Sequence, residues 1–222
     1  MTLVFTVLAR WLRGVSRSGA AAGALVCFLL YVGAGPGAFA ALVTVFVLAW
    51  ITTRVGYQRK QRLGTAEKRD GRTASQVLAN LGVAAACAVV HFVTGNTRVL
   101  LAAVAALSEA AADTVSSELG QASSDTARLI TTWEKVPAGT DGGISLAGTA
   151  GGLAAAGVVS AVGAVTGLLT WHWLWISVAA ATVGVIADSY LGALLERRHM
   201  LNNDAVNFLS TLLASGIVLW LA

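Results

Sequence analysis

The distribution of charged residues constrains this chain more than any other feature. Asp, Glu, Lys and Arg are absent from four stretches, residues 18–53, 73–97, 142–187 and 205–222. A helix needs about 20 apolar residues to cross a bilayer, and about 17 are tolerated. Of the 222 residues 12% are charged and 56% are apolar, whereas about a quarter of a soluble domain is charged. We therefore expect an all-α polytopic membrane protein, and exclude a soluble enzyme, a secreted disulfide scaffold and a disordered chain.

The charge-free stretches predict about seven membrane-spanning helices. The first stretch is interrupted by Gly33-Ala34-Gly35-Pro36-Gly37, which favours a helix break between two short passes. The third is long enough for two passes that turn near residues 168–173. A further pass must lie between Arg98 and Gly120, although it contains three acidic residues. The expected passes are residues 18–35, 37–54, 73–94, 99–118, 145–168, 174–193 and 205–222.

The basic residues indicate how the chain is oriented. If the N-terminus is cytoplasmic, every one of the 15 Lys and Arg residues except Arg98 falls on the cytoplasmic side, as the positive-inside rule predicts. We expect one transmembrane domain, residues 18–222, with cytoplasmic loops 55–72, 119–144 and 194–204. Residues 1–17 are expected to lie along the membrane interface. The protein would reside in the inner or plasma membrane if its source is prokaryotic.

Polar residues gather at the expected cytoplasmic ends of the helices. Arg72, Gln76 and Asn80 form one stripe at helical spacing, and the first of them is either the last positive-inside residue or a phosphate clamp. Further polar residues end the fourth and sixth passes and open the seventh; they are Glu109, Asp113, Ser117, Glu118, Asp188, Ser189, Asn203, Asp204 and Asn207. Ionisable residues within membrane spans usually mark a functional site.

Simpler structural roles remain open for several of these acids. Asp113 could pair with Arg72, Glu109 could be a protonated carboxyl bonded to a neighbouring helix, and Asn203 and Asp204 could cap the seventh pass. On an ideal helix Glu118 lies about 140° from Asp113. Glu118 can therefore join Asp113 only if the helix ends or distorts near residue 120.

A glycine-rich loop precedes the fifth pass. Residues 137–149 lead into a helix start through Gly142, Gly143, Ser145 and Thr149, with Lys135 just before them. Free backbone N–H groups at such a start favour an anion, typically phosphate. The loop is not a Walker A motif, because no Gly-Lys-Ser/Thr follows. Taken alone, Ser145 can be an ordinary N-cap.

A short internal repeat predicts that two of the acids meet. Ala112-Asp-Thr recurs as Ala187-Asp-Ser, so Asp113 and Asp188 are 75 positions apart. A parallel repeat of the helix hairpins 73–120 and 145–192 would place Asp113 and Asp188 across from one another, a common origin of membrane sites.

The combination of these features favours phosphoryl transfer. Several carboxylates with amide and hydroxyl neighbours are ligands for a hard ion such as Mg²⁺, and the glycine loop and basic side chains suit phosphates. A nucleotide would arrive from the cytoplasm, and a lipid phosphate could enter between helices. Nucleotidyl transfer to a lipid phosphate remains open, as does a non-enzymatic transporter that uses Glu109, Asp113 and Asp188. No nucleic-acid partner is expected, and the chain could form a homodimer.

These segments resemble an integral membrane family, formerly of unknown function, that includes plant phytyl-phosphate kinase and animal transmembrane protein 19. The resemblance covers nearly all of the chain after Ser18. It is carried by Gly71-Arg-Thr-Ala-Ser-Gln-Val-Leu-Ala-Asn80, Ala112-Asp-Thr-Val-Ser-Ser-Glu-Leu-Gly120, Gly142-Gly-Ile-Ser-Leu-Ala-Gly-Thr-Ala-Gly151, Ala187-Asp-Ser-Tyr-Leu-Gly192 and Asn203-Asp-Ala-Val-Asn207. The chain is also remotely similar to CTP-dependent dolichol and phytol kinases, and prenol kinase activity is a further alternative.

The resemblance implies a nucleotide-dependent kinase that converts an isoprenoid monophosphate, of phytyl or prenyl type, to its diphosphate with Mg²⁺, CTP being the favoured donor. By motif, Asp113, Glu118 and Asp188 would hold the metal and the nucleotide phosphates. The phosphate-binding residues would be Arg72, Gln76, Asn80, Lys135, Gly142, Gly143, Ser145, Thr149, Asn203, Asp204 and Asn207. The first helix hairpin is short for the family, and the resemblance identifies no residues on the acceptor side.

Overall fold

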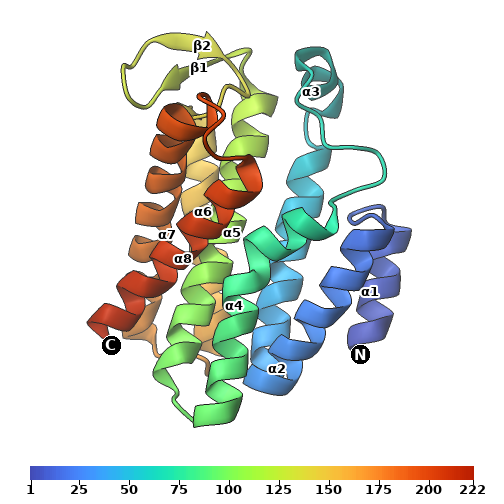
Figure 1. Cartoon of the computed structure of the whole chain (residues 1–222), viewed down its shortest axis with the longest axis vertical. Coiled ribbons are helices and arrows are strands. Elements are labelled where there is room, and N and C mark those ends of the chain that lie inside the picture. Colours follow the sequence, from blue (N-terminus) through green and yellow to red (C-terminus); the bar gives the residue numbers. More distant parts are fainter.

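The apolar segments form helices close to the predicted bounds. The computed structural model describes all 222 residues, Met1–Ala222, and Figure 1 shows a bundle of helices with a small sheet at one end. Six helices are long and apolar enough to cross a membrane. The helices are α1 (Thr2–Trp11), α2 (Arg17–Arg54), α3 (Tyr57–Leu63), α4 (Ala74–Thr94), α5 (Arg98–Ser123), α6 (Leu146–Val165), α7 (Trp171–Leu191), continued by the π-helix η1 (Gly192–Glu196), and α8 (Asn203–Leu221).

Helix α2 is a hairpin of two arms. Gly35 has φ 81° and ψ −177°, which is not helical, and Pro36 follows it inside α2. The end of the second arm is bound to the end of α1, because Trp50 Nε1 and Arg54 Nη2 both donate to the carbonyl of Leu12, at 3.2 and 2.6 Å. Figure 1 shows the two arms side by side. With α2 crossing twice, the six helices supply the seven predicted passes, and the break lies where it was predicted.

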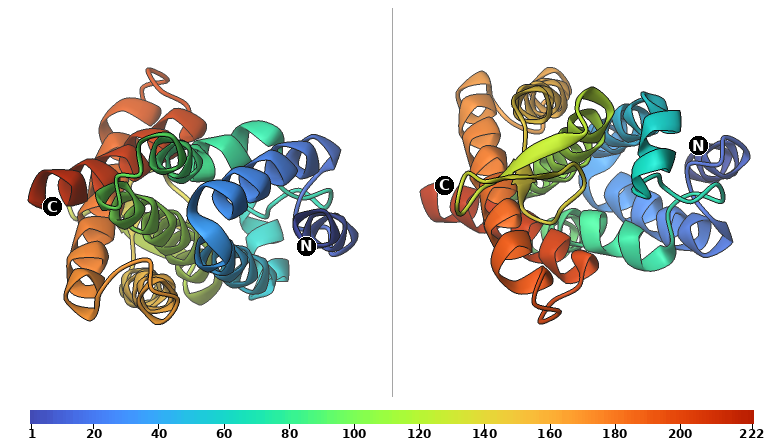
Figure 2. Two further views of the ribbon diagram at one scale, coloured as in Figure 1. Left: turned by 90° about the horizontal axis from the view of Figure 1, so that it is seen from below. Right: turned by 90° about the horizontal axis from the view of Figure 1, so that it is seen from above.

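Helix α5 lies at the centre of the bundle (Figure 2). The most apolar stretch of α5 is 78% buried, against 44% or less in the other spanning helices. Small residues allow this close packing: Ser108 of α5 shares a 2.9 Å hydrogen bond with Ser160 of α6, which donates to Ser177 of α7 at 2.9 Å. Such contacts let membrane helices approach and satisfy their polar groups. The acids of α5 therefore face other helices and not lipid.

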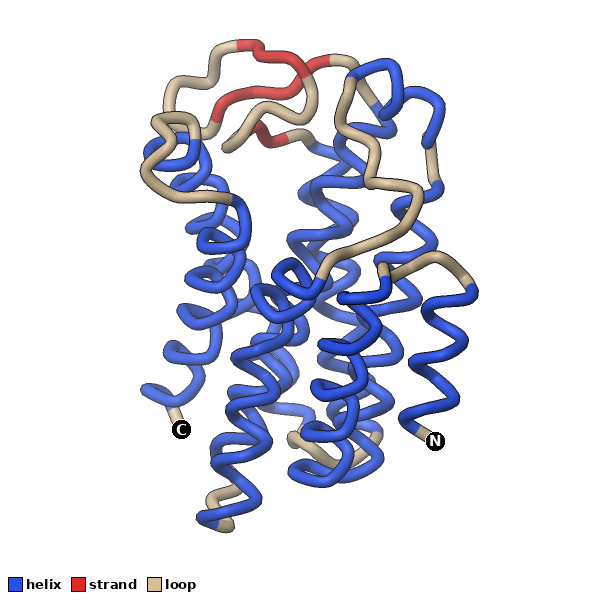
Figure 3. The backbone as a smooth tube through the Cα atoms, turned by 45° about the vertical axis from the view of Figure 1, so that its right-hand side comes forward, coloured by secondary structure: helices blue, strands red, loops and turns tan.

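The loop before α6 contains the strands. Strands β1 (Thr126–Leu129), β2 (Lys135–Pro137) and β3 (Gly143–Ile144) form an antiparallel sheet in the order β2-β1-β3, with Ala127 opposite Val136 and Leu129 opposite Gly143. No pattern in the 119–144 loop predicted this sheet, although the chain as a whole is α-helical as predicted. Figure 3 shows the strands at the same end of the bundle as α3. We call this the loop end.

The two predicted hairpins run in the same direction. Helices α4 and α6 lead away from the loop end, and α5 and α7 return to it (Figure 1). Asp188 lies in the last turn of α7 and Asp113 about three turns before the end of α5, so both are in the halves of their helices nearer the loop end.

Helix α1 packs against the second arm of α2. The ring of Phe5 meets the rings of Phe39 and Phe46 edge-on, with centroids 5.6 and 5.2 Å apart. The opposite face of α1 is apolar and exposed, with Leu3, Val4 and Val7 each about 70% accessible. The interfacial position of residues 1–17 stays a prediction.

Candidate functional site

A polar cavity of about 150 Å³ lies at the loop end. Helices α5 and α7, the start of α6 and the glycine loop enclose it. Its lining includes Asp113, Ser117, Asp141, Gly142, Gly143, Ser145, Thr149, Asp188, Ser189, Glu196 and Asn203. We call it the acidic cavity. It brings together the glycine loop and the two acids that the repeat pairs, from segments that are distant in the sequence.

Glycines let the loop lie directly on the end of α7. Gly142 has φ +76°, and a Cβ placed there would be 2.5 Å from Ala193 Cβ and 2.6 Å from the carbonyl oxygen of Ser189. Ser145 caps α6 by accepting a 3.1 Å hydrogen bond from the N–H of Gly148. The N-terminus of α6, with its partial positive charge, is thereby fixed at the cavity wall.

We expect Gly142→Ala to weaken folding. An alanine held in the left-handed backbone conformation lowers the free energy of unfolding by about 1–2 kcal/mol, and steric crowding at this position lowers it by about 1–3 kcal/mol more. Gly64→Ala is the matched control, since Gly64 has φ +74° but no atom lies within 4 Å of its built Cβ. Thermal unfolding would measure the loss of stability in each variant. Equal losses in the two variants would contradict close packing of the Gly142 turn.

The buried acid oxygens include two without a hydrogen-bond partner. They are Asp188 Oδ2 and, one helical turn deeper in α5 than Asp113, Glu109 Oε1. Buried polar atoms are nearly always satisfied, so an unsatisfied carboxylate oxygen in a cavity lining is where a ligand is expected.

No three Asp, Glu, His or Cys side chains form a metal-binding group by themselves. Mg²⁺ is commonly held by one or two carboxylates together with waters and phosphates, and Asp113 and Asp188 fit that pattern.

Two further acids that the motifs did not predict line the cavity. Asp141 immediately precedes the Gly142 turn, a position that could have suggested it. Burial raises the pKa of Asp141, while Arg197 and His199 lower it. Glu196 reaches the cavity because α7 ends in a π-helical turn. Such turns are frequent at functional sites, but no local sequence pattern predicts the π-helical turn at residues 192–196. Four carboxylates thus line a single cavity, which favours a cation there.

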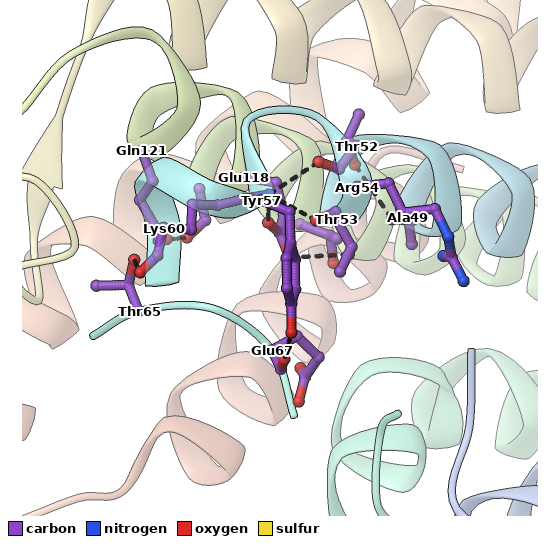
Figure 4. Close-up of polar contacts among 12 residues, drawn as sticks. Ala49, Thr52, Thr53, Arg54, Tyr57, Lys60, Thr65, Glu67, Glu118 and Gln121 are labelled. Atoms are coloured by element: carbon purple, nitrogen blue, oxygen red, sulfur yellow. Dashed lines mark hydrogen bonds and ion pairs between the residues drawn. The ribbon is translucent and has the colours of Figure 1, made fainter. Parts of the chain in front are cut away.

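Glu118 does not join this group. Helix α5 continues without a break to Ser123, so the distortion that would turn Glu118 toward Asp113 is absent. Its Oε2 atom pairs with Lys60 Nζ, and its Oε1 atom accepts a 2.8 Å hydrogen bond from Thr53. Figure 4 shows these contacts, which join α5 to α2 and α3. The geometry gives Glu118 a structural contact, whereas the motif had suggested a metal ligand.

Lys60 is buried, although it lies in the basic loop 55–72. Its side chain is 0% exposed, and besides Glu118 it donates to the carbonyls of Thr52 and Thr53, at 3.0 and 2.8 Å. All three ammonium donors are thereby used. Nothing in the charge run 54–70 distinguishes Lys60 from its basic neighbours, so its burial could not be predicted.

A second polar cavity, of about 220 Å³, adjoins the acidic cavity. We call it the Arg72 cavity. Its lining includes Glu67, Arg72, Gln76, Asn80, Thr114, Glu118 and Asn207, and it shares Asp113, Ser117, Gln121 and Asn203 with the acidic cavity. The predicted stripe on α4 therefore does lie beside the acids. Part of it is structural, because Gln76 Oε1 completes the capping box of α4 by accepting from the N–H of Thr73 at 2.8 Å.

Three predicted residues line neither cavity. Lys135 is exposed on β2, Asp204 is half-buried in the first turn of α8, and Glu109 is fully buried below Asp113. Lys135 was proposed from its place in the sequence, but the strand register directs it away from the loop that contacts α7.

Comparison with known proteins agrees with this architecture. The family model described as "Integral membrane protein DUF92" matches residues 1–215. The chain belongs to this family. It is accordingly an integral, multi-pass membrane protein.

Similar proteins occur in plants, archaea and cyanobacteria. "Protein VTE6, chloroplastic" of Arabidopsis thaliana is 33% identical over 215 residues, which cover 93% of this chain and 65% of the plant protein. "Uncharacterized membrane protein MJ0933" of Methanocaldococcus jannaschii is 33% identical over 97% of this chain and 90% of its own length. "Uncharacterized membrane protein sll0875" of Synechocystis is 32% identical over 86% and 76%. The chain thus spans less than two thirds of VTE6. No solved structure matches it.

Proposed function

We propose that this protein is a magnesium- and nucleotide-dependent kinase that converts an isoprenoid monophosphate to its diphosphate. The observation that carries the proposal is the acidic cavity, where Asp113 and the unpartnered Asp188 oxygen lie with the Gly142–Ser145 turn. The family that the motifs resemble includes plant phytyl-phosphate kinase, which supports the choice of substrate. We place the loop end in the cytoplasm on the basis of the basic residues.

Different residues would bind the phosphoryl donor and the acceptor. Asp113 and Asp188 would hold the magnesium, which when bound neutralises phosphate oxygens. The backbone N–H groups near Gly143 and the N-terminus of α6 would hold the nucleotide phosphates, with CTP as the favoured donor. An oxygen of the acceptor phosphate forms the new P–O bond to the γ-phosphorus. The bond from that phosphorus to the β–γ bridging oxygen breaks, leaving the nucleoside diphosphate.

The acceptor needs no general base in this scheme. A phosphate monoester is already anionic at neutral pH, so no proton must be removed before attack. Neither cavity is lined by a histidine, which is consistent with that chemistry. Arg72 in the adjoining cavity supplies a cation for the acceptor phosphate.

The direct test is an assay of the purified protein in lipid nanodiscs with phytyl or geranylgeranyl phosphate, Mg²⁺ and each nucleoside triphosphate in turn. We expect the lipid diphosphate and the nucleoside diphosphate in equal amounts. Pyrophosphate with a CMP-linked lipid would instead establish nucleotidyl transfer. No lipid product with any pairing, together with solute flux in liposomes that needs no nucleotide, would replace the kinase by a transporter.

A further inference from the structure

A third cavity, with a mostly apolar wall, is not used by the scheme above. Its volume is about 330 Å³, within the range of about 300–1,000 Å³ usual for small-molecule sites. It lies between α1, both arms of α2, α4 and the chain around residues 67–72. Apolar side chains dominate its wall, among them Phe5, Leu42, Val45, Phe46, Val77 and Leu81, and basic ones gather in its lining, namely Arg13, Arg54, Lys68, Arg69 and Arg72. We call it the apolar cavity.

The apolar cavity continues into the site. Glu67, Arg72, Gln76, Asn80 and Thr114 line both it and the Arg72 cavity, which in turn shares Asp113 with the acidic cavity. The basic residues line the apolar cavity, the Arg72 cavity is polar and contains Arg72 together with the acids Glu67, Asp113 and Glu118, and the acidic cavity is lined by carboxylates. An amphiphile with an apolar chain and an anionic head would match the apolar cavity and its basic residues, with its head at Arg72, where the first two cavities meet.

Arg72 is held at the junction with free capacity to bind an anion. Its backbone is fixed to the segment before α2, since its carbonyl accepts from Ser16 N at 2.9 Å and its N–H donates to Gly14 O at 3.2 Å. Two guanidinium nitrogens donate to Thr114 Oγ1, both at 3.3 Å. No carboxylate pairs with Arg72, although Arg10 pairs with Asp70. A guanidinium has five N–H donors, so several remain for a phosphate.

We propose that the apolar cavity binds the isoprenoid chain of the acceptor and that Arg72 binds its phosphate. This inference rests on the proposed function, because it assigns the second substrate of the same reaction. The acceptor-side residues, which the motifs did not identify, are then those of α1, α2 and α4. The chain is expected to lie against Gly23 and Cys27 on the first arm of α2, which also line the cavity.

Binding can be tested without turnover. A geranylgeranyl phosphate carrying a diazirine near the middle of its chain would be photolysed with the protein in nanodiscs, without nucleotide, and the labelled peptides mapped by mass spectrometry. We expect saturable labelling of α1, α2 and α4 that unmodified geranylgeranyl phosphate displaces and phosphatidylglycerol does not. Labelling spread over the exposed apolar face of α8, or displacement by any phospholipid, would overturn the proposal.

A filling substitution tests the same cavity through kinetics. A Cβ built at Gly23 has no atom within 4 Å, so Gly23→Leu should occupy the empty space without moving the backbone. We expect its KM for geranylgeranyl phosphate to rise at least about tenfold and its photolabelling to fall, while the KM for the nucleotide is unchanged. Gly157→Leu is the matched control, since Gly157 of α6 is equally uncrowded and lines none of the three cavities.

The outcomes separate this inference from the proposed function. Displaceable labelling in the apolar cavity without diphosphate formation would support the lipid site and refute the kinase. Kinase activity with identical lipid KM values for Gly23→Leu and Gly157→Leu would support the kinase and refute the lipid site.

Discussion

Replacing Asp188 with asparagine is expected to lower kcat for diphosphate formation by about 100-fold or more. The substitution keeps the shape of the side chain but removes the charge of a carboxylate whose buried oxygen has no protein partner. Asp113→Asn should have a similar effect, because both residues line the acidic cavity. The measurement is the rate of diphosphate formation at saturating lipid phosphate over a range of Mg²⁺ concentrations, where both variants should also need more magnesium.

Asp204→Asn provides the control for this prediction. Asp204 belongs to a motif of the resemblance, yet it lines neither polar cavity. We expect its rate to remain within about twofold of the unmodified protein, in line with a substitution outside the site. A fully active Asp188→Asn variant, or an Asp204→Asn variant as inactive as Asp188→Asn, would refute the assignment of the acidic cavity as the catalytic site.

Lys60→Met is expected to reduce the free energy of unfolding by about 3–5 kcal/mol. The reason is that Glu118, whose side chain is only 13% exposed, loses its cation while keeping its charge. Chemical and thermal unfolding in detergent would measure the loss. The double variant Lys60→Met with Glu118→Gln should recover most of it, because the uncompensated charge is then removed as well.

Arg62→Met serves as the control, since Arg62 is exposed on the same short helix α3. Its effect should stay within about 0.5 kcal/mol. If Lys60→Met were as stable as Arg62→Met, the buried ion pair would not hold α3 to α5. If Glu118→Gln alone abolished catalysis as completely as Asp188→Asn, Glu118 would have to be assigned to the metal site.

The helices and their break were predictable because their signals are local. The length of each apolar stretch determines a pass, and Gly35 with Pro36 ends the first arm of α2 through backbone geometry alone. The meeting of Asp113 and Asp188 followed from the repeat, which is a pattern within the chain. These features depend little on how distant segments pack.

The remaining parts of the site depend on packing that the sequence does not display. Glu118 is drawn to Lys60 only because α3 folds back onto α5, and a basic loop gives no sign of this. Glu196 reaches the acidic cavity through a π-helical turn, and Lys135 is carried away from the cavity by a strand register. The apolar cavity arises between helices that are each ordinary amphipathic or apolar segments.

Helix α1 has a consequence for how a substrate reaches Arg72. Ten residues of helix extend about 15 Å, about half of the hydrocarbon thickness of a bilayer. Phe5, Thr6 and Ala9 of α1 line the apolar cavity, so part of its wall is a helix too short to cross the membrane. If a lipid entered sideways past α1, the protein would draw its substrate from a single leaflet, and no flipping of the phosphate across the bilayer would be required.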